Sequence, residues 1–426
     1  MTQVRPFRAL VYNQEKIKDL SQVVCPPYDI ISPERQQHFH DVHPQNFIHV
    51  LFGKDIPGED KYRRAESCFN DWIKNKILAL DCGPAFYFYW QQFKIRGEKR
   101  TRVGFIGLLR LEDKKSSIFA HEHTRLEAKE DRARLLKRVK ANLSPIFVVS
   151  PDRKRIIQRT YQKYIRNAKP FIDITDDEQV SHKVWRLDAP LAVAAVESAL
   201  SQENMFIADG HHRYEVACAY REEMRQKLGR LTGEEPFNYV LAYITSPDPR
   251  GLIIFPIHRL VKLDAAPDMP ALSQRLKAYF DVEEVKSDDK ARFFFLLAKA
   301  GGTEHIIGMY RDKKYWLLRL KNVKILDKII ADKPAGYRSL DVSILNYLVL
   351  RDALGIDLGD KIKVGFYPQE EELISRVDNG EAHVAFFLNP VRMQQIIDVA
   401  LAGERMPPKS TYFYPKVLSG LVINKF

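Results

Sequence analysis

The chain has 426 residues, of which 45% are hydrophobic and 11% aromatic, and its formal net charge is +12. This length and apolar content predict a globular protein of two or three domains and exclude a disordered or fibrous chain. The apolar runs are too short or too interrupted to cross a bilayer, and residues 1–7 lack the apolar segment of a signal peptide. We therefore expect a cytoplasmic protein with no membrane partner.

The cysteines and the charge restrict the class of protein further. Cys25, Cys68, Cys82 and Cys218 are widely scattered and show no CxxC spacing, which predicts reduced thiols rather than a disulfide scaffold. The excess of basic residues favours anionic partners such as nucleotides, phosphorylated metabolites or nucleic acid. The charge alone does not choose among these partners.

The first part of the chain reads as a mixture of helices and strands. Expected elements are a strand at 9–12, a stiff loop at 25–29, helices at 33–39 and 62–78, strands at 85–93 and 102–111, a basic amphipathic helix at 132–140 and a buried strand at 144–149. The strands at 85–93 and 102–111 form a hairpin around Arg96-Gly97-Glu98.

The rest of the chain also alternates between expected helices and strands. It predicts a helix at 191–200, strands at 237–245 and 251–255, a helix and a short strand near Phe293 within 267–335, a hairpin at 305–320, a helix at 342–354, a strand at 364–367, a helix at 370–377, a strand at 382–388 and a helix at 391–402. This alternation indicates an α/β (mixed α+β) fold.

The most informative stretch is Phe206–Glu215, where an apolar run stops at Asp209-Gly210 and a helical pattern starts at once. The N-terminus of a helix favours an anion, and Gly210 allows a phosphate to approach the backbone without meeting a Cβ atom. Asp209, His211, His212, Arg213 and Glu215 offer metal ligation, proton transfer and charge neutralisation within one turn. The alternative is a surface helix with Asp209 as its N-cap and a solvated histidine pair.

A second ionisable segment begins at His121-Glu122-His123-Thr124. On an extended backbone His121 and His123 would share one face, as two ligands of one metal must, whereas a loop would break that geometry. Residues 121–134 are the most densely ionisable part of the chain, as a phosphoryl-transfer or acid/base site requires. Metal ligation, a general polar site and a structural role all remain open for this segment.

The tail Met406–Lys416 places hydrogen-bond donors between prolines that restrict the backbone. These donors are Lys409, Ser410, Thr411, Tyr412, Tyr414 and Lys416. Such a segment can hold an anion, or it can simply add an edge strand to a sheet. Elsewhere the chain has no P-loop, no Gly-x-Gly-x-x-Gly and no Gly-x-Ser-x-Gly, so a nucleotide site must be of another kind.

Six motifs occur in a recognisable order. They are Val24-Cys-Pro-Pro-Tyr-Asp-Ile-Ile31, Asn46-Phe-Ile-His49, His121-Glu-His-Thr124, Lys129-Glu-Asp-Arg132, Ala208-Asp-Gly-His-His-Arg-Tyr-Glu215 and Met406-Pro-Pro-Lys-Ser-Thr-Tyr-Phe-Tyr-Pro-Lys416. With these motifs the sequence resembles, over almost its whole length, the prokaryotic family called domain of unknown function 1015. That family label names no reaction.

The segment Asp209–Arg213 also resembles the signature of the ParB/sulfiredoxin superfamily, whose free-serine kinases carry a similar Asp-Gly-His-His-Arg. The resemblance implies a ParB/sulfiredoxin-like nucleotide-binding core with inserted and C-terminal α/β modules. It implies that Gly210, His211, His212 and Arg213 contact phosphate, and that Asp209 binds Mg²⁺ or the substrate hydroxyl. Sulfiredoxins need a reactive cysteine beside this motif, where the present chain has histidine.

These observations predict a catalytic region at 1–265, with an insertion at about 60–200, and a C-terminal region at 266–426 whose tail can return to the site. The expected activity is a Mg²⁺-dependent transfer of phosphate, with ATP or ADP, to free serine or a similar small hydroxy amino acid. The predicted catalytic residues are Asp209, His211, His212, Glu122 and Glu215, with Glu122 or Glu215 as the base, and the predicted substrate-binding residues are Tyr28, Asp29, His123, Lys409 and Ser410.

Three alternatives stay open. The same site could release phosphate from phosphoserine, which is nearly the same chemistry in the other direction. A nucleotide-gated DNA-binding regulator of the ParB type would use the net positive charge, although no helix-turn-helix is evident and the basic residues are dispersed. A metal-dependent hydrolase would use His121, His123, His211 and His212 as ligands.

Overall fold

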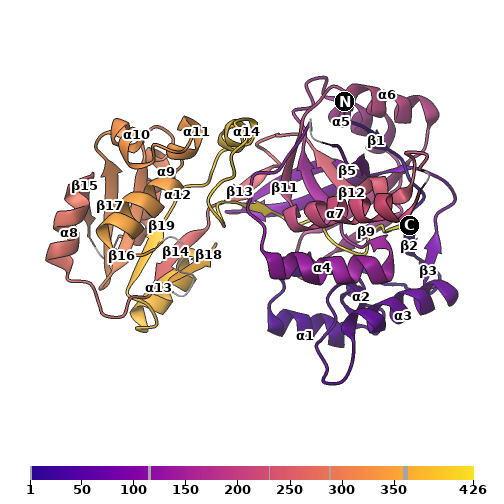
Figure 1. Cartoon of the computed structure of the whole chain (residues 1–426), viewed down its shortest axis with the longest axis horizontal. Coiled ribbons are helices and arrows are strands. Elements are labelled where there is room, and N and C mark those ends of the chain that lie inside the picture. Colours follow the sequence, from indigo (N-terminus) through magenta and orange to yellow (C-terminus); the bar gives the residue numbers. More distant parts are fainter. Residues whose placement is uncertain (1, 114–116, 230, 287–288, 358–362) are drawn as a thin grey trace. The chain divides into compact units, whose positions relative to one another are not determined.

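The computed structural model describes residues 2–113, 117–229, 231–286, 289–357 and 363–426. The chain forms two compact units, the first built from residues 1–120, 124–253 and 415–426, and the second from residues 121–123 and 254–414 (Figure 1). The units divide after residue 253, earlier than the expected boundary at 265. In the part of the chain that the structure describes, no helix is both long enough and apolar enough to cross a membrane.

The first unit is built around a mixed, nine-stranded sheet. Its strands follow one another in the order β6 (Ile118–Phe119), β11 (Met205–Asp209), β8 (Ile146–Val149), β12 (Tyr239–Thr245), β5 (Glu98–Arg110), β4 (Phe86–Ile95), β10 (Ser181–Leu187) and β9 (Ile172–Thr175), with β1 (Val4–Arg5) beside β5. The predicted hairpin is confirmed, because β4 and β5 pair antiparallel up to Ile95 and Glu98. Arg96 and Gly97 have positive φ angles of 49° and 82°, as a two-residue hairpin turn requires.

The α-helices of the first unit pack against this sheet or against one another, and α7 carries the predicted motif. They are α1 (Pro33–Val42), α2 (Ile48–Leu51), α3 (Lys61–Lys74), α4 (Leu126–Val139), α5 (Ile156–Thr160), α6 (Pro190–Leu200) and α7 (His211–Lys227). Helices α4 and α7 lie side by side (Figure 1). Leu136 of α4 and Val216 and Tyr220 of α7 belong to one apolar cluster. This packing aligns the start of α7 with residues at the start of α4.

The C-terminal segment, residues 415–426, is part of the core of the first unit. Ser419 and Ile423 form isolated antiparallel β-bridges with Cys25 and Leu10, respectively. Strand β21 (Asn424–Lys425) pairs with β7 (Ala141–Asn142). The apolar side chains of this segment are buried, namely Val417, Leu418, Leu421, Val422 and Ile423. Removing them from water contributes to the stability of the first unit, whose other segments lie far away in sequence.

The second unit has a six-stranded sheet in the order β15 (Phe280–Val285), β17 (Lys314–Leu320), β16 (Ile306–Arg311), β19 (Val384–Phe387), β14 (His258–Val261) and β18 (Val364–Tyr367). Its helices are α8 (Met269–Lys277), α9 (Lys290–Ala300), α10 (Leu326–Ile329), α11 (Ala335–Arg338), α12 (Asp341–Ile344), which continues as a π-helix over Leu345–Ala353, α13 (Glu370–Asp378) and α14 (Met393–Leu401). The short strands β13 (Ile253–Phe255) and β20 (Tyr412–Tyr414) pair with each other, as do β2 (Leu10–Tyr12) and β3 (Leu78–Leu80).

Two sequence-based predictions of secondary structure are wrong. The short strand expected near Phe293 is helix α9, in which Phe293 and Leu297 are buried one turn apart while Phe295 is 62% exposed. A run of apolar residues has no period that separates a strand from a helix, and packing on one face selects the helix. The helix expected at 62–78 ends at Lys74, because Leu78 belongs to β3.

Candidate functional site

The predicted turn from strand to helix is present in the first unit. Strand β11 ends at Asp209, and Gly210 joins it to α7 with φ 89° and ψ 28°. That left-handed conformation favours glycine, which also leaves the helix start without a side-chain cap. The positive end of a 17-residue helix therefore begins directly after the Asp209 carboxylate.

Asp209 is held between two cations. One carboxylate oxygen accepts a hydrogen bond from Nη2 of Arg213 at 2.6 Å, and the other accepts one from Nζ of Lys416. The side chains of all three residues are only 10% or 11% exposed. Burial by itself would raise the pKa of the Asp209 carboxyl, but the positive charges of Lys416 and Arg213 outweigh it and lower the pKa to about 2. Asp209 is therefore ionised at neutral pH.

Arg213 is fixed by its neighbours and still has hydrogen-bonding capacity. Its Nη1 donates to the carbonyl oxygen of Pro145, at the entry to β8. Its buried Nε has no hydrogen-bond partner among the described residues. A Cβ atom at Gly210 would lie 2.9 Å from Cζ of Arg213, so glycine at this position leaves room for the guanidinium. Arg213 thus presents a buried cation with a donor to spare at the start of α7.

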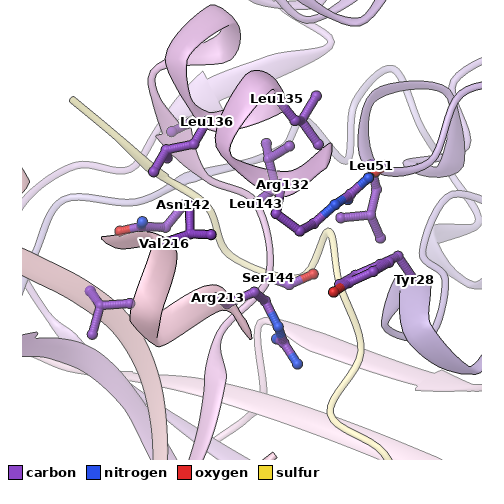
Figure 2. Close-up of a pocket in the computed structure, with 12 residues that line it drawn as sticks. Tyr28, Leu51, Arg132, Leu135, Leu136, Asn142, Leu143, Ser144, Arg213 and Val216 are labelled. Carbon is purple, nitrogen blue, oxygen red and sulfur yellow. The ribbon is translucent and has the colours of Figure 1, made fainter. Parts of the chain in front are cut away.

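A small pocket adjoins Arg213 (Figure 2). Its lining combines two guanidiniums, a few polar groups and an apolar wall: Tyr28, Leu51, Arg132, Leu135, Leu136, Ala141, Asn142, Leu143, Ser144, Arg213, Val216 and Val240. The space inside is about 50 Å³, enough for a few water molecules or one phosphate-sized group. This volume is far below that of a site enclosing a whole small ligand.

Tyr28 and Arg132 form one wall of this pocket. The Cζ atom of Arg132 lies 4.1 Å from the centre of the Tyr28 ring, and its Nη1 donates to the carbonyl oxygen of Leu51 at 2.7 Å. Arg132 is also paired with Asp131. Burial raises the pKa of the Tyr28 hydroxyl to about 12, so the group is a neutral hydrogen-bond donor at physiological pH. The adjacent Asp29, predicted with Tyr28 as substrate-binding, is exposed.

The other predicted residues of α7 contact the start of α4. The backbone N–H of Arg125 donates to Nε2 of His212 at 2.9 Å. Glu215 accepts from Oγ1 of Thr124 at 2.6 Å and from Nζ of Lys129 at 3.3 Å. His211 is buried, with 3% exposed. The structure therefore brings the Thr124–Lys129 segment and the start of α7 together.

The remaining predicted residues belong to the second unit. His121 follows β6 outside any strand, and its carbonyl oxygen accepts from the N–H of Met406 at 2.7 Å. The carbonyl oxygen of Glu122 accepts from Arg405 at 3.3 Å, so the His121–His123 motif lies beside the tail. In that tail the hydroxyl of Ser410 donates to the carbonyl oxygen of Pro407. The carbonyl oxygen of Lys409 accepts from Arg259 at 3.1 Å.

Asp209 does not fit the predicted role of magnesium ligand. Each of its oxygens is hydrogen-bonded to a cation, which leaves the carboxylate engaged and adds positive charge where Mg²⁺ would have to bind. Among the residues that the structure describes, no group of three or more His, Cys, Asp or Glu side chains is arranged to hold a metal ion.

The sequence-based site omitted the residues that hold Lys416. Arg102 of β5 is buried and donates to Gln91 and to the carbonyl oxygen of Pro415, while Nε2 of Gln91 donates to the carbonyl oxygen of Lys416 at 2.9 Å. The density of donors in Met406–Lys416 predicts an anion-binding tail. Nothing in the linear sequence indicated that Lys416, rather than Lys409 or Ser410, would meet Asp209.

Comparison with solved structures returns distant likenesses. A free serine kinase in complex with AMP is 14% identical with a TM-score of 0.32, covering 70% of this chain and 83% of that one. SbnI with a C-terminal truncation, from Staphylococcus aureus, is 11% identical with a TM-score of 0.37, covering 74% and 86%. A conserved hypothetical protein from Pyrococcus furiosus is 13% identical with a TM-score of 0.31, covering 71% and 89%. TM-scores this low do not establish a shared fold.

Comparison with curated proteins finds no match. The family comparison is decisive, because the pattern of one family matches residues 4–343, which is most of the chain. It agrees with the resemblance drawn from the order of the six motifs. The chain belongs to the family described as protein of unknown function, DUF1015.

Proposed function

We propose that the protein is a phosphotransferase that binds nucleotide phosphates at the start of α7 and transfers a phosphoryl group to free serine or a similar small hydroxy amino acid. The observation that carries this proposal is Arg213, a buried guanidinium whose Nε has no hydrogen-bond partner among the described residues. It lies beside a helix N-terminus that has no side-chain cap. Buried cations and helix N-termini both stabilise phosphate oxygens. The resemblance of Asp209–Arg213 to the motif of free-serine kinases supports the same assignment.

In this proposal the turn supplies positioning and charge. The N–H groups at Gly210, His211 and His212 and the Arg213 guanidinium hold phosphate oxygens of ATP or ADP, with Ser144 and Arg132 close by in the pocket wall. Asp209, ionised and ahead of the helix, accepts the hydrogen bond of the substrate hydroxyl. Phosphoryl transfer needs little covalent chemistry from the protein, and this placement of charge supplies most of what it requires.

The remaining assignments keep the status of predictions. Tyr28, in the pocket wall, is the member of the substrate-binding set that lies with Arg213. Glu215 is a candidate base, although its carboxylate is engaged by Thr124 and Lys129. Glu122, His123, Lys409 and Ser410 belong to the second unit and Asp29 is exposed. The proposal assigns no step to Mg²⁺, because both Asp209 oxygens are engaged by cations in the ligand-free protein.

Phosphorus NMR tests the proposal directly. The purified protein is incubated with serine and ATP or ADP, with and without Mg²⁺, and separately with phosphoserine alone. Arg213→Ala is the active-site variant, and Arg250→Ala, which removes a 77% exposed arginine of the same unit, is the matched control. We expect phosphoserine to form from nucleotide with wild type and the control, and not with Arg213→Ala.

Two results would redirect or end the proposal. Release of inorganic phosphate from phosphoserine alone, dependent on Arg213, would identify a phosphatase that uses the same site. Absence of both reactions, together with no binding of ATP or ADP, would refute the assignment.

A further inference from the structure

The C-terminal segment, residues 415–426, places Lys416 at the proposed phosphate site. Three contacts hold the backbone of this segment. Arg102 donates to the carbonyl oxygen of Pro415, Gln91 donates to that of Lys416, and the backbones of Ser419 and Cys25 form an isolated β-bridge. The hydroxyl of Ser419 also hydrogen-bonds that of Ser144, a residue of the pocket wall. These contacts hold the segment on both sides of Lys416, and the one from Ser419 ties it to the pocket wall.

Lys416 and Arg213 occupy opposite oxygens of one carboxylate. Asp209 therefore contacts these two cations in the way that a phosphate group would, because its two anionic oxygens are directed at a lysine and a guanidinium. An arriving phosphate, which offers more negative charge and more acceptor oxygens than a carboxylate, competes with Asp209 for the same donors. The Lys416 ammonium has three N–H donors, so it can contact both acceptors, but the stronger hold of the phosphate weakens its pairing with Asp209.

We propose that Lys416 is a phosphate-binding residue that Asp209 holds in the ligand-free protein, and that phosphate binding transfers Lys416 from the carboxylate to the ligand. The transfer releases one Asp209 oxygen toward the substrate hydroxyl. The proposal rests on the function proposed above and adds a residue and an order of events to it. The released carboxylate still faces Arg213 and His211 of α7 and the Arg102 guanidinium from β5.

Calorimetry at neutral pH with ADP, pyrophosphate and adenosine tests the transfer. Lys416→Met should weaken binding of ADP and pyrophosphate about tenfold to hundredfold, the range of a charge-assisted hydrogen bond, and leave adenosine binding unchanged. Lys416→Arg should keep most of the affinity. Lys425→Met is the matched control, because Lys425 lies in the same segment and is exposed.

Competition between Asp209 and phosphate for Lys416 leads to a second prediction, which would not hold if Lys416 had only a structural role. Asp209→Asn removes the competing carboxylate and should tighten ADP binding about tenfold, whereas the double variant Asp209→Asn/Lys416→Met should lose that gain. Circular dichroism and thermal unfolding establish that each variant is folded. If Asp209→Asn does not fold, the comparison of Lys416→Met with Lys416→Arg still decides the role of the lysine.

The outcomes separate this inference from the proposed function. If the wild-type protein binds neither ADP nor pyrophosphate, the proposed phosphate site is refuted, and the inference about Lys416 fails with it. Wild type that binds ADP, with Lys416→Met binding equally well, overturns the inference alone. Equal losses of ADP and adenosine affinity in Lys416→Met would also overturn it, because they would show a structural effect without preference for phosphate.

Discussion

Replacing Asp209 by asparagine tests the electrostatics of the site through stability rather than activity. The wild-type pKa is lowered from 3.8 to about 2, so folding favours the charged carboxylate by about 2 kcal/mol. Asp209 is only 10% exposed, so solvent screens this interaction little. Because the folded-state pKa is depressed, the stabilisation is complete well above pH 4 and is lost as the pH falls toward 2. About half of it should be gone at pH 3.

The variant should be less stable than wild type at neutral pH by about 3–5 kcal/mol, because Arg213 and Lys416 stay buried without their carboxylate. The difference should shrink by about 1 kcal/mol between pH 5 and pH 3. Urea unfolding followed by tryptophan fluorescence measures it, since Trp72, Trp90 and Trp185 all lie in the first unit. A difference in unfolding free energy that stays constant from pH 5 to pH 3 would show that Asp209 is not held as the structure indicates.

Three further predictions concern positions that the fold makes sensitive. Gly210→Ala should destabilise the protein by about 1–3 kcal/mol, from the positive φ angle, and should weaken ADP binding by displacing Arg213; unchanged thermal stability and affinity would contradict both effects. Deletion of residues 415–426 should abolish cooperative unfolding of the first unit in circular dichroism, because it removes a buried part of its core, and a truncated chain that melts like wild type would disprove this. Phe293→Ala should lower the unfolding free energy in urea by about 3–5 kcal/mol and Phe295→Ala by less than about 1 kcal/mol; similar losses would contradict the helical placement of α9.

Several features of the fold could be predicted from local pattern. The start of α7 was predictable because an apolar strand, a glycine and a helical period meet at Asp209-Gly210, and all three act over a few residues. The β4–β5 hairpin was predictable for the same reason, since Arg96-Gly97 sets both the turn and the register. The order of the six motifs was sufficient to place the chain in its family.

Strand β10 shows where local pattern fails. Its position 182 carries a histidine that is fully buried, with its ring nitrogens 2.6 Å from the hydroxyl of Tyr89 and 2.9 Å from the carboxylate of Asp176. A polar residue at a core position interrupts the alternation by which a strand is recognised. Its burial is tolerable only because partners from β4 and from a neighbouring loop satisfy both nitrogens.

The content of the site depends on a contact that no local pattern encodes. Asp209 and Lys416 are 207 residues apart in the chain, and they meet because the terminal segment fills a place in the core of the first unit. Burial of its apolar residues stabilises that placement, and the hydrogen bonds from Gln91 and Arg102 define where Lys416 lies. The residue types of the proposed phosphate site could thus be read along the chain. Which lysine joins them follows from long-range packing, whose free energy is spread over many residues distant in sequence.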